Sequence, residues 1–127
     1  MANESSSKDN SDDQATVAGG VPVYKINKTA KPAVLRLVKG PGAPKDYVLD
    51  LDEVIVGRGQ DAHVIIDSES ISRRHAAFER SESGYRCRDL GSSNGLLVNA
   101  TLVPSAELKD GDSVQIGDAL FMYRAGT

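Results

Sequence analysis

From Ala33 to the end of the chain, short runs of β-forming residues alternate with clusters of turn residues. The runs are rich in Val, Ile, Leu, Tyr and Phe, which favours strands, and no stretch keeps a helical period. The predicted strands are 34–38, 47–51, 53–56, 63–66, 76–80, 85–90, 96–98, 101–103, 113–116 and 120–123. About ten to eleven short strands at this spacing predict an all-β fold, an antiparallel β-sandwich, rather than an α/β sheet.

The predicted strand 85–90 alternates apolar and basic side chains. Tyr85 and Cys87 share one face, and Arg86 and Arg88 share the other. Cys87 is therefore interpreted as a small core residue and not as a reactive thiol. A single cysteine excludes an internal disulfide, and with only two histidines in the chain we expect no metal site.

The first part of the chain has a different composition. Residues 1–20 are rich in Ser, Asp and Asn and contain almost no large apolar side chains. Burial cannot offset the ordering entropy of such a segment. We therefore expect residues 1–31 to be a disordered tail and linker, and residues 32–127 to form one folded domain. Thr16 and Thr29 are candidate phosphorylation sites in the tail.

The net charge of −3 comes from the tail, because residues 1–20 hold one base and four acids and the remainder is balanced. The folded part lacks the basic field of a general nucleic-acid binder, and two Phe and four Tyr make no aromatic platform. No apolar run reaches membrane-spanning length, and the N-terminus lacks a signal-peptide pattern. We expect a cytoplasmic protein without membrane or nucleic-acid partners.

Gly57-Arg58 ends an apolar run and precedes the loop 59–62. The glycine permits a tight or bulged backbone, which aims the next side chain. A guanidinium at a strand end presents a planar fork that suits phosphate oxygens and stays charged at physiological pH. A surface arginine paired with Asp61 or Asp67 is the alternative left open by this pattern.

The segment 70–75, Ser-Ile-Ser-Arg-Arg-His, leads into the predicted strand at Ala76. Hydroxyls, two arginines and loop amides together indicate an anion-binding concavity. Alternatively, Ser72 only hydrogen-bonds nearby backbone. The Ser72-x-x-His75 spacing also allows a nucleophile and its base, but the sequence has no nucleophile elbow and no phosphate-binding Gly-Lys-Ser/Thr loop. We therefore expect no enzyme activity and no cofactor.

Ser92-Ser93-Asn94-Gly95 lies between two predicted strands. Asn-Gly is a common hairpin turn in its own right. The amide of Asn94 could also meet the backbone of an extended peptide, because it both donates and accepts hydrogen bonds.

Together, Gly57-Arg58, Ser72-x-x-His75, Ser93-Asn94-Gly95 and Asn99 resemble the pattern of the forkhead-associated (FHA) domain, a β-sandwich with binding loops at one end that recognises phosphothreonine. The resemblance covers residues 32–124. It implies a phosphopeptide site made of Arg58, Ser72, Arg73, Ser93, Asn94 and Ser70. The first three would contact the phosphate and Ser93 would shape the pocket for the threonine methyl group. Asn94 would bind the peptide backbone, and Ser70 would read the residue three after the phosphothreonine.

The resemblance also implies supporting roles. His75 would fix the loops from beneath, and Gly57, Gly95 and Asn99 would hold backbone shape. This chain departs from the family pattern at Leu96, where threonine is frequent, and at Ala100, where glycine is frequent. A positive φ at Ala100 would cost about 1 kcal/mol.

These observations predict a non-catalytic phosphothreonine-peptide-binding module that acts as an adaptor or regulator in Ser/Thr-kinase signalling. Its partners would be a phosphothreonine-containing protein and a Ser/Thr kinase, and we expect a monomer. The alternative is phosphorylation-independent docking that regulates a target enzyme. Under either hypothesis a phosphorylated tail could occupy the site of its own domain and inhibit it.

Overall fold

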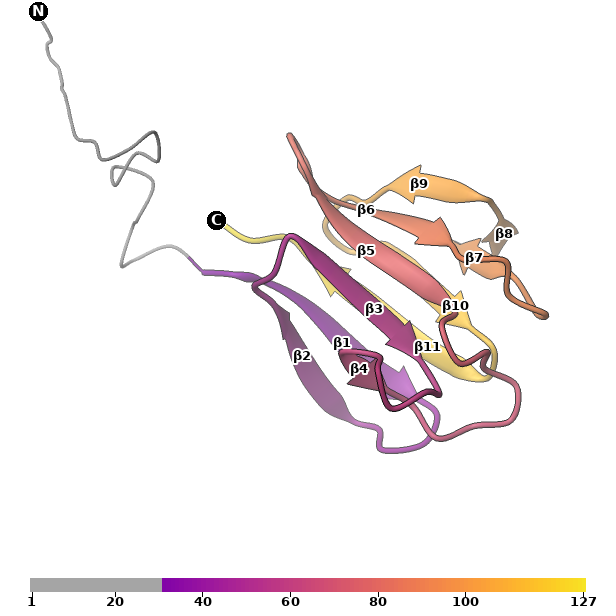
Figure 1. The fold of residues 1–127 in the computed structure, drawn as a ribbon. Helices are drawn as coiled ribbons and strands as arrows, with labels where there is room; N and C mark the ends of the chain where they lie inside the picture. Colours follow the sequence, from indigo (N-terminus) through magenta and orange to yellow (C-terminus); the bar gives the residue numbers. More distant parts are fainter. Residues whose placement is uncertain (1–30) are drawn as a thin grey trace, which may run out of the picture. The chain divides into compact units, whose positions relative to one another are not determined.

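The computed structural model describes residues 31–127, which contain eleven β-strands (Figure 1). The strands are β1 (Ala33–Lys39), β2 (Lys45–Leu49), β3 (Glu53–Gly57), β4 (Val64–Ile65), β5 (Ala76–Ser81), β6 (Gly84–Asp89), β7 (Leu96–Val98), β8 (Thr101–Leu102), β9 (Ser105–Glu107), β10 (Ser113–Ile116) and β11 (Ala119–Arg124). They form a six-stranded sheet in the order β2-β1-β11-β10-β7-β8 and a five-stranded sheet in the order β4-β3-β5-β6-β9. The predicted all-β sandwich is confirmed.

Two features of the sheets differ from the sequence prediction. The strand β9 was not predicted, because Ser105-Ala106-Glu107 has no apolar alternation; it forms by pairing with β6. The short strand β4 pairs parallel to β3, with Val64 opposite Val56, although an antiparallel sandwich was expected. The connecting loop doubles back, and the His63 N–H donates to the Ile55 carbonyl over 2.9 Å.

The core lies between the two sheets, because apolar side chains alternate with polar ones along the strands. The six-stranded sheet contributes Leu35 and Phe121, and the five-stranded sheet contributes Val56 and Phe78; all four side chains are fully buried. The Tyr85 hydroxyl donates to the Leu51 carbonyl over 2.7 Å. Burying side chains of this size stabilises a fold by about 1.5–3 kcal/mol each.

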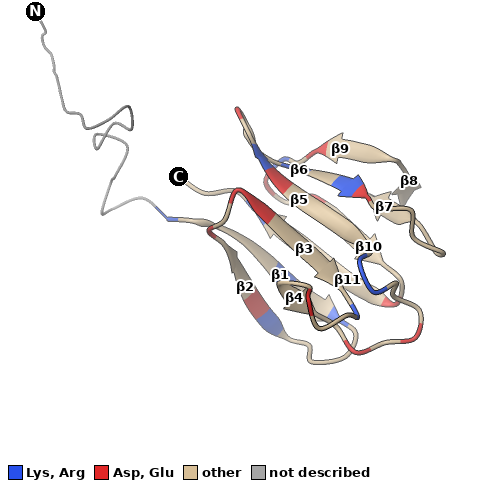
Figure 2. Cartoon of the chain, viewed as in Figure 1, with Lys and Arg blue, Asp and Glu red and all other residues tan. Residues whose placement is uncertain are grey.

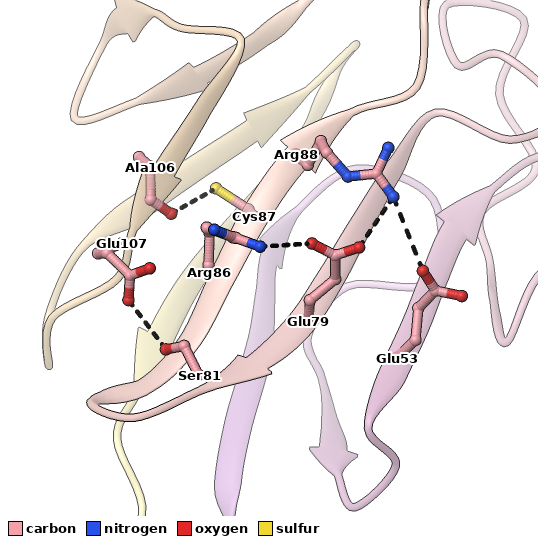
Figure 3. A network of polar contacts seen from close by, with 8 residues as sticks. All are labelled: Glu53, Glu79, Ser81, Arg86, Cys87, Arg88, Ala106 and Glu107. Carbon is pink, nitrogen blue, oxygen red and sulfur yellow. Dashed lines mark hydrogen bonds and ion pairs between the residues drawn. The ribbon is translucent and has the colours of Figure 1, made fainter.

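Cys87 also faces this core, as its position in the sequence predicted, and is fully buried. Burial raises the pKa of its thiol to about 11. The neighbouring Arg86 and Arg88 point to the opposite face of the sheet, where both donate to Glu79 (Figure 3). The hydrogen bond from Arg88 is the main reason that the pKa of Glu79 lies below its ordinary value.

A second, smaller apolar cluster lies on the outer face of the five-stranded sheet. Ile55, Ala77 and Ala62 are buried there, and Leu90 packs against them. Ala62 belongs to the β3–β4 loop and Leu90 to the β6–β7 loop, so both loops are anchored on the sheet face near its end.

The described unit begins at Lys31, whose N–H donates to Oγ1 of Thr127 over 2.8 Å. The expected tail and both candidate phosphorylation sites, Thr16 and Thr29, lie outside the described residues, apart from Lys31 itself. Within residues 31–127, no helix is long and apolar enough to cross a membrane.

Candidate phosphopeptide site

Four connections meet at one end of the sandwich: residues 58–63, 66–75, 90–95 and the turn 117–118. They follow β3, β4, β6 and β10 and lead into β4, β5, β7 and β11. The strand directions therefore bring all four connections to the same end of the sandwich (Figure 1). All but two of the predicted site residues lie in these loops. Gly57 ends β3 directly before them, and Asn99 lies elsewhere.

Gly57 is required for a close approach of two chain segments. A Cβ added to it would lie 2.0 Å from the carbonyl oxygen of Arg73, and its φ is not positive. Because the segments approach so closely, the Arg58 N–H donates to the Ser72 carbonyl and the Gly59 N–H to the Arg73 carbonyl, each over 3.0 Å. Glycine is therefore required at position 57 because there is no room for a side chain, and not because of the bulge or tight turn that the sequence suggested.

The Arg58 side chain is held by a backbone group and not by a carboxylate. Its Nε donates to the Ile71 carbonyl over 3.0 Å. Within residues 31–127, no acid lies within 4.0 Å of its guanidinium, and Asp61 instead approaches Arg74 at 3.5 Å. Pairing of Arg58 with Asp61 or Asp67, the alternative considered from the sequence, does not occur in the described structure. Among residues 31–127, no hydrogen bond or ion pair involves its two Nη groups.

A hollow of about 610 Å³ opens beside Arg58. Its lining residues are Arg58, Gly59, Gln60, Asp61, Arg73 and Arg74. Three arginines and one aspartate give it a charge of +2, which matches the charge of about −1.5 to −2 on a phosphorylated side chain at pH 7. Figure 2 shows that the basic positions lie on two neighbouring loops, at the end of β3 and directly before β5.

Ser72 and His75 connect this hollow to the β6–β7 loop. The Ser72 hydroxyl accepts from the Ser93 N–H over 3.2 Å, so its own proton remains available to an anion. The fully buried His75 accepts from the Ser72 N–H at Nδ1, over 3.1 Å, and its Nε2 lies 2.7 Å from the Gly95 carbonyl oxygen. A neutral ring with its proton on Nε2 satisfies both bonds. His75 therefore links the loops from beneath.

Asn94 and Ser70 also meet across two loops. The Asn94 side chain donates to the Ser70 carbonyl over 2.7 Å, and its remaining polar groups face solvent. The Ser70 hydroxyl is also hydrogen-bonded: it donates to the Asp118 carboxylate and accepts from the Asp118 N–H, both over 2.9 Å.

Sequence reasoning overlooked Asp89 and assigned no role to Ser92, although both residues shape the 90–95 loop. The carboxylate of Asp89 accepts from the Gly91 N–H over 3.0 Å and from the Ser92 N–H over 3.2 Å, and it also accepts from the Ser92 hydroxyl. That hydroxyl in turn accepts from the Gly95 N–H over 2.9 Å. The Asp-x-Gly-Ser spacing is a local signal for such a turn. Asp89 and Ser92 thus present Ser93 and Asn94, both exposed, at the loop tip.

Asn99 and Ala100 lie away from this cluster, after the last residue of β7. They form the two-residue turn into β8 with φ of 51° and 68°, so the positive φ considered for Ala100 occurs. Asn99 accepts from the Ser113 N–H over 3.0 Å and donates to Asp112 over 3.0 Å. Its contacts hold the β7–β8 turn against β10 and do not reach the loops described above.

In the part of the chain that the structure describes, no group of three His, Cys, Asp or Glu side chains could hold a metal ion. Ser72 does not hydrogen-bond the His75 ring through its hydroxyl; only its N–H does so. His75 is therefore not positioned to accept the proton of the Ser72 hydroxyl as a general base.

An all-β scaffold with arginines, a serine hydroxyl and an asparagine on neighbouring loops is the arrangement expected of the FHA class of domains. The model of the FHA domain matches residues 54–117. The chain belongs to the FHA family.

Relatives and a solved structure agree with this assignment. The chain is 36% identical over 95 residues to the oxoglutarate dehydrogenase inhibitor of Corynebacterium jeikeium, covering 75% of this chain and 66% of that protein. It is 37% identical over 94 residues to the glycogen accumulation regulator GarA of Mycolicibacterium smegmatis, covering 74% and 60%. A structure from a study of phosphothreonine-dependent FHA domain interactions superposes with a TM-score of 0.67 at 32% identity, covering 73% of this chain and 95% of that one.

The chain thus spans about three-fifths to two-thirds of the length of these two curated relatives. The family model matches residues 54–117, which run from β3 to the turn after β10, so that match concerns the sandwich and its loops.

Proposed function

We propose that this protein binds phosphothreonine peptides and acts without catalysis, as an adaptor or regulator in Ser/Thr-kinase signalling. The observation that carries the proposal is the hollow of charge +2 beside Arg58 and Arg73. Arg58, Arg73 and the Ser72 hydroxyl would bind the phosphate. Ser93 and Asn94 would contact the threonine methyl group and the peptide backbone.

The strength of these contacts favours dependence on phosphorylation. A hydrogen bond to a charged group contributes about 1.5–3 kcal/mol. Two or three such bonds would favour a phosphopeptide over the unmodified peptide by roughly 3 kcal/mol or more, which is about a hundredfold in affinity. Aspartate or glutamate would replace the phosphothreonine poorly, because a carboxylate has fewer acceptor oxygens and less charge.

The named relatives support a regulatory role. One is an inhibitor of an enzyme and the other a regulator of glycogen accumulation. By analogy, this protein would dock onto a target protein through the same loops, and its partners would be a phosphothreonine-containing protein and the kinase that modifies it. It would act in the cytoplasm, as a monomer.

The test is capture of peptides from a phosphothreonine library, with phosphoserine and unmodified libraries as controls, followed by calorimetric titration of the captured sequences. The wild-type protein should enrich phosphothreonine peptides, and Arg58→Ala should weaken their binding at least tenfold. Arg124→Ala is the matched control, because Arg124 is an exposed arginine on β11 outside the hollow. Equal binding of modified and unmodified peptides would refute the proposal.

The same variant decides between the two modes of docking once a partner is known. If Arg58→Ala leaves partner binding intact while both proteins remain folded, docking is independent of phosphorylation. If binding is lost with Arg58→Ala but kept with Arg124→Ala, the partner is read through its phosphate.

A further inference from the structure

The turn between β10 and β11 is fastened to the candidate site through Ser70. The Asp118 carboxylate and N–H both bond the Ser70 hydroxyl, each over 2.9 Å. The contact is close, because a Cβ added to Gly117 would lie 2.6 Å from the Ser70 carbonyl oxygen. Asn94 donates to that same carbonyl. Asp118 is therefore held next to the loop over which the peptide is proposed to run.

Asp118 presents an open negative charge at this position. Hydrogen bonds from the hydroxyls of Ser68 and Ser70 hold the pKa of its carboxyl below the ordinary value, so it is ionised at neutral pH. The residue is exposed. No Lys or Arg among residues 31–127 lies within 4.0 Å of its carboxylate.

The two flanks of the site thus carry opposite charge. The arginines that line the hollow lie at the end of β3 and before β5, whereas acidic positions lie in the β4–β5 loop and at the β10–β11 turn (Figure 2). A ligand that spans both flanks would be negative at one end and positive at the other.

We propose that Asp118 is a specificity-determining residue, which selects phosphopeptides that carry a lysine or arginine where the chain passes Ser70. This inference rests on the proposed function. With the phosphate between Arg58 and Arg73 and the backbone at Asn94, an extended peptide advances about 3.3 Å per residue. A basic side chain a few residues from the phosphothreonine then reaches the Asp118 carboxylate.

The preference should be modest and sensitive to salt. Ion pairs at exposed positions contribute little, which corresponds to a two- to fivefold change in affinity at about neutral pH. Because Ser70 already fixes the Asp118 rotamer, the pair lies at the upper end of this range. Added salt screens it.

The experiment is a lysine scan of one phosphothreonine peptide, with a single lysine placed at each position on either side, measured by fluorescence anisotropy at low and high salt. One position should bind about two- to fivefold more tightly than the others at low salt. Asp118→Asn should abolish that preference, and Asp118→Lys should transfer it to a glutamate at the same position. Asp50→Asn is the matched control, because it removes the same charge from the β2–β3 connection at the opposite end of the sandwich.

A second variant, Ser70→Ala, frees the Asp118 carboxylate without changing the charge and should reduce the preference without abolishing it. Melting curves establish that each variant is folded. A scan in which no lysine position is preferred, or in which the preference persists in Asp118→Asn, overturns this inference while Arg58-dependent binding leaves the proposed function standing. Equal binding of phosphorylated and unmodified peptides removes the proposed function, and this inference with it.

Discussion

Replacing Gly57 by alanine would add one methyl group where β3 meets the loop with the proposed phosphate contacts. The new Cβ would lie 2.0 Å from the Arg73 carbonyl oxygen and 3.0 Å from that of Ser72. To restore a separation of 3.0 Å, the Arg73 carbonyl must move by about 1 Å. Because the φ of Gly57 is not positive, alanine accepts the backbone conformation and the whole effect is steric.

This movement would break two backbone hydrogen bonds, from the N–H groups of Arg58 and Gly59 to the Ser72 and Arg73 carbonyls. Each contributes about 0.5–1.5 kcal/mol to stability, so the free energy of unfolding should fall by about 1–3 kcal/mol. In a domain of this size, 1 kcal/mol changes the melting temperature by about 4–8 °C. Phosphopeptide affinity should fall as well, because Arg58 and Ser72 would separate.

Calorimetric melting and peptide titration together check this reasoning. Gly111→Ala is the matched control: its φ is +89° and a Cβ there would have no neighbour within 4 Å, so it introduces backbone strain alone. Gly111 lies in the turn before β10, away from the candidate site. Gly111→Ala should lower the melting temperature and leave peptide affinity unchanged. If Gly57→Ala melts like the wild type and binds normally, the close approach of the two segments does not determine the site.

Three further predictions concern the scaffold. Ala100→Gly should raise the free energy of unfolding by about 0.5–1 kcal/mol in a chemical denaturation curve. Glycine relieves the strain of the positive φ at this position, and this gain is larger than the loss from the greater entropy of the unfolded chain. Ala106→Gly, within β9, is the control and should lower the free energy of unfolding. Cys87 should react with a thiol reagent at pH 8 only after denaturation, since it is fully buried and its pKa is about 11; rapid labelling of the native protein would contradict its core position. The pKa of Glu79 is lowered mainly by its hydrogen bond with Arg88, so its carboxylate stabilises the fold above its unfolded pKa, and this stability is lost as the pH falls through the folded pKa. In Glu79→Gln the melting temperature should therefore fall less steeply on acidification than in the wild type. An unchanged dependence of the melting temperature on pH would refute this assignment.

Most strands could be predicted from the sequence because apolar side chains that face the core alternate with polar side chains that face solvent. Leu35 and Leu37, for example, are fully buried on β1 while Arg36 between them is exposed. The strand β9 could not be predicted, because Ser105 and Glu107 face solvent and only pairing with β6 makes the segment extended. Such a strand is defined by its neighbour and leaves no pattern of its own.

In the candidate site, too, some features could be predicted from the sequence and others could not. The arginines and the loop motifs are visible in the sequence, since their residue types suit phosphate and peptide backbone. The contact of Ser70 with Asp118 joins residues 48 positions apart, and no local pattern indicates it. The reason for Gly57 was equally hidden, because the clashing carbonyl belongs to Arg73 in another loop.

The loops of the candidate site are held together by groups other than the proposed phosphate donors. His75 bonds Ser72 and Gly95 as a neutral ring, and Asn94 bonds the Ser70 carbonyl, while Arg58 is positioned only through its Nε. The charged donors therefore remain available, and their geometry is set before the ligand arrives. A preorganised site loses less conformational entropy on binding, so a larger share of the contact energy with the phosphate contributes to affinity. Loosening the neutral bonds beneath the loops should then weaken phosphopeptide binding even when all the phosphate contacts are retained.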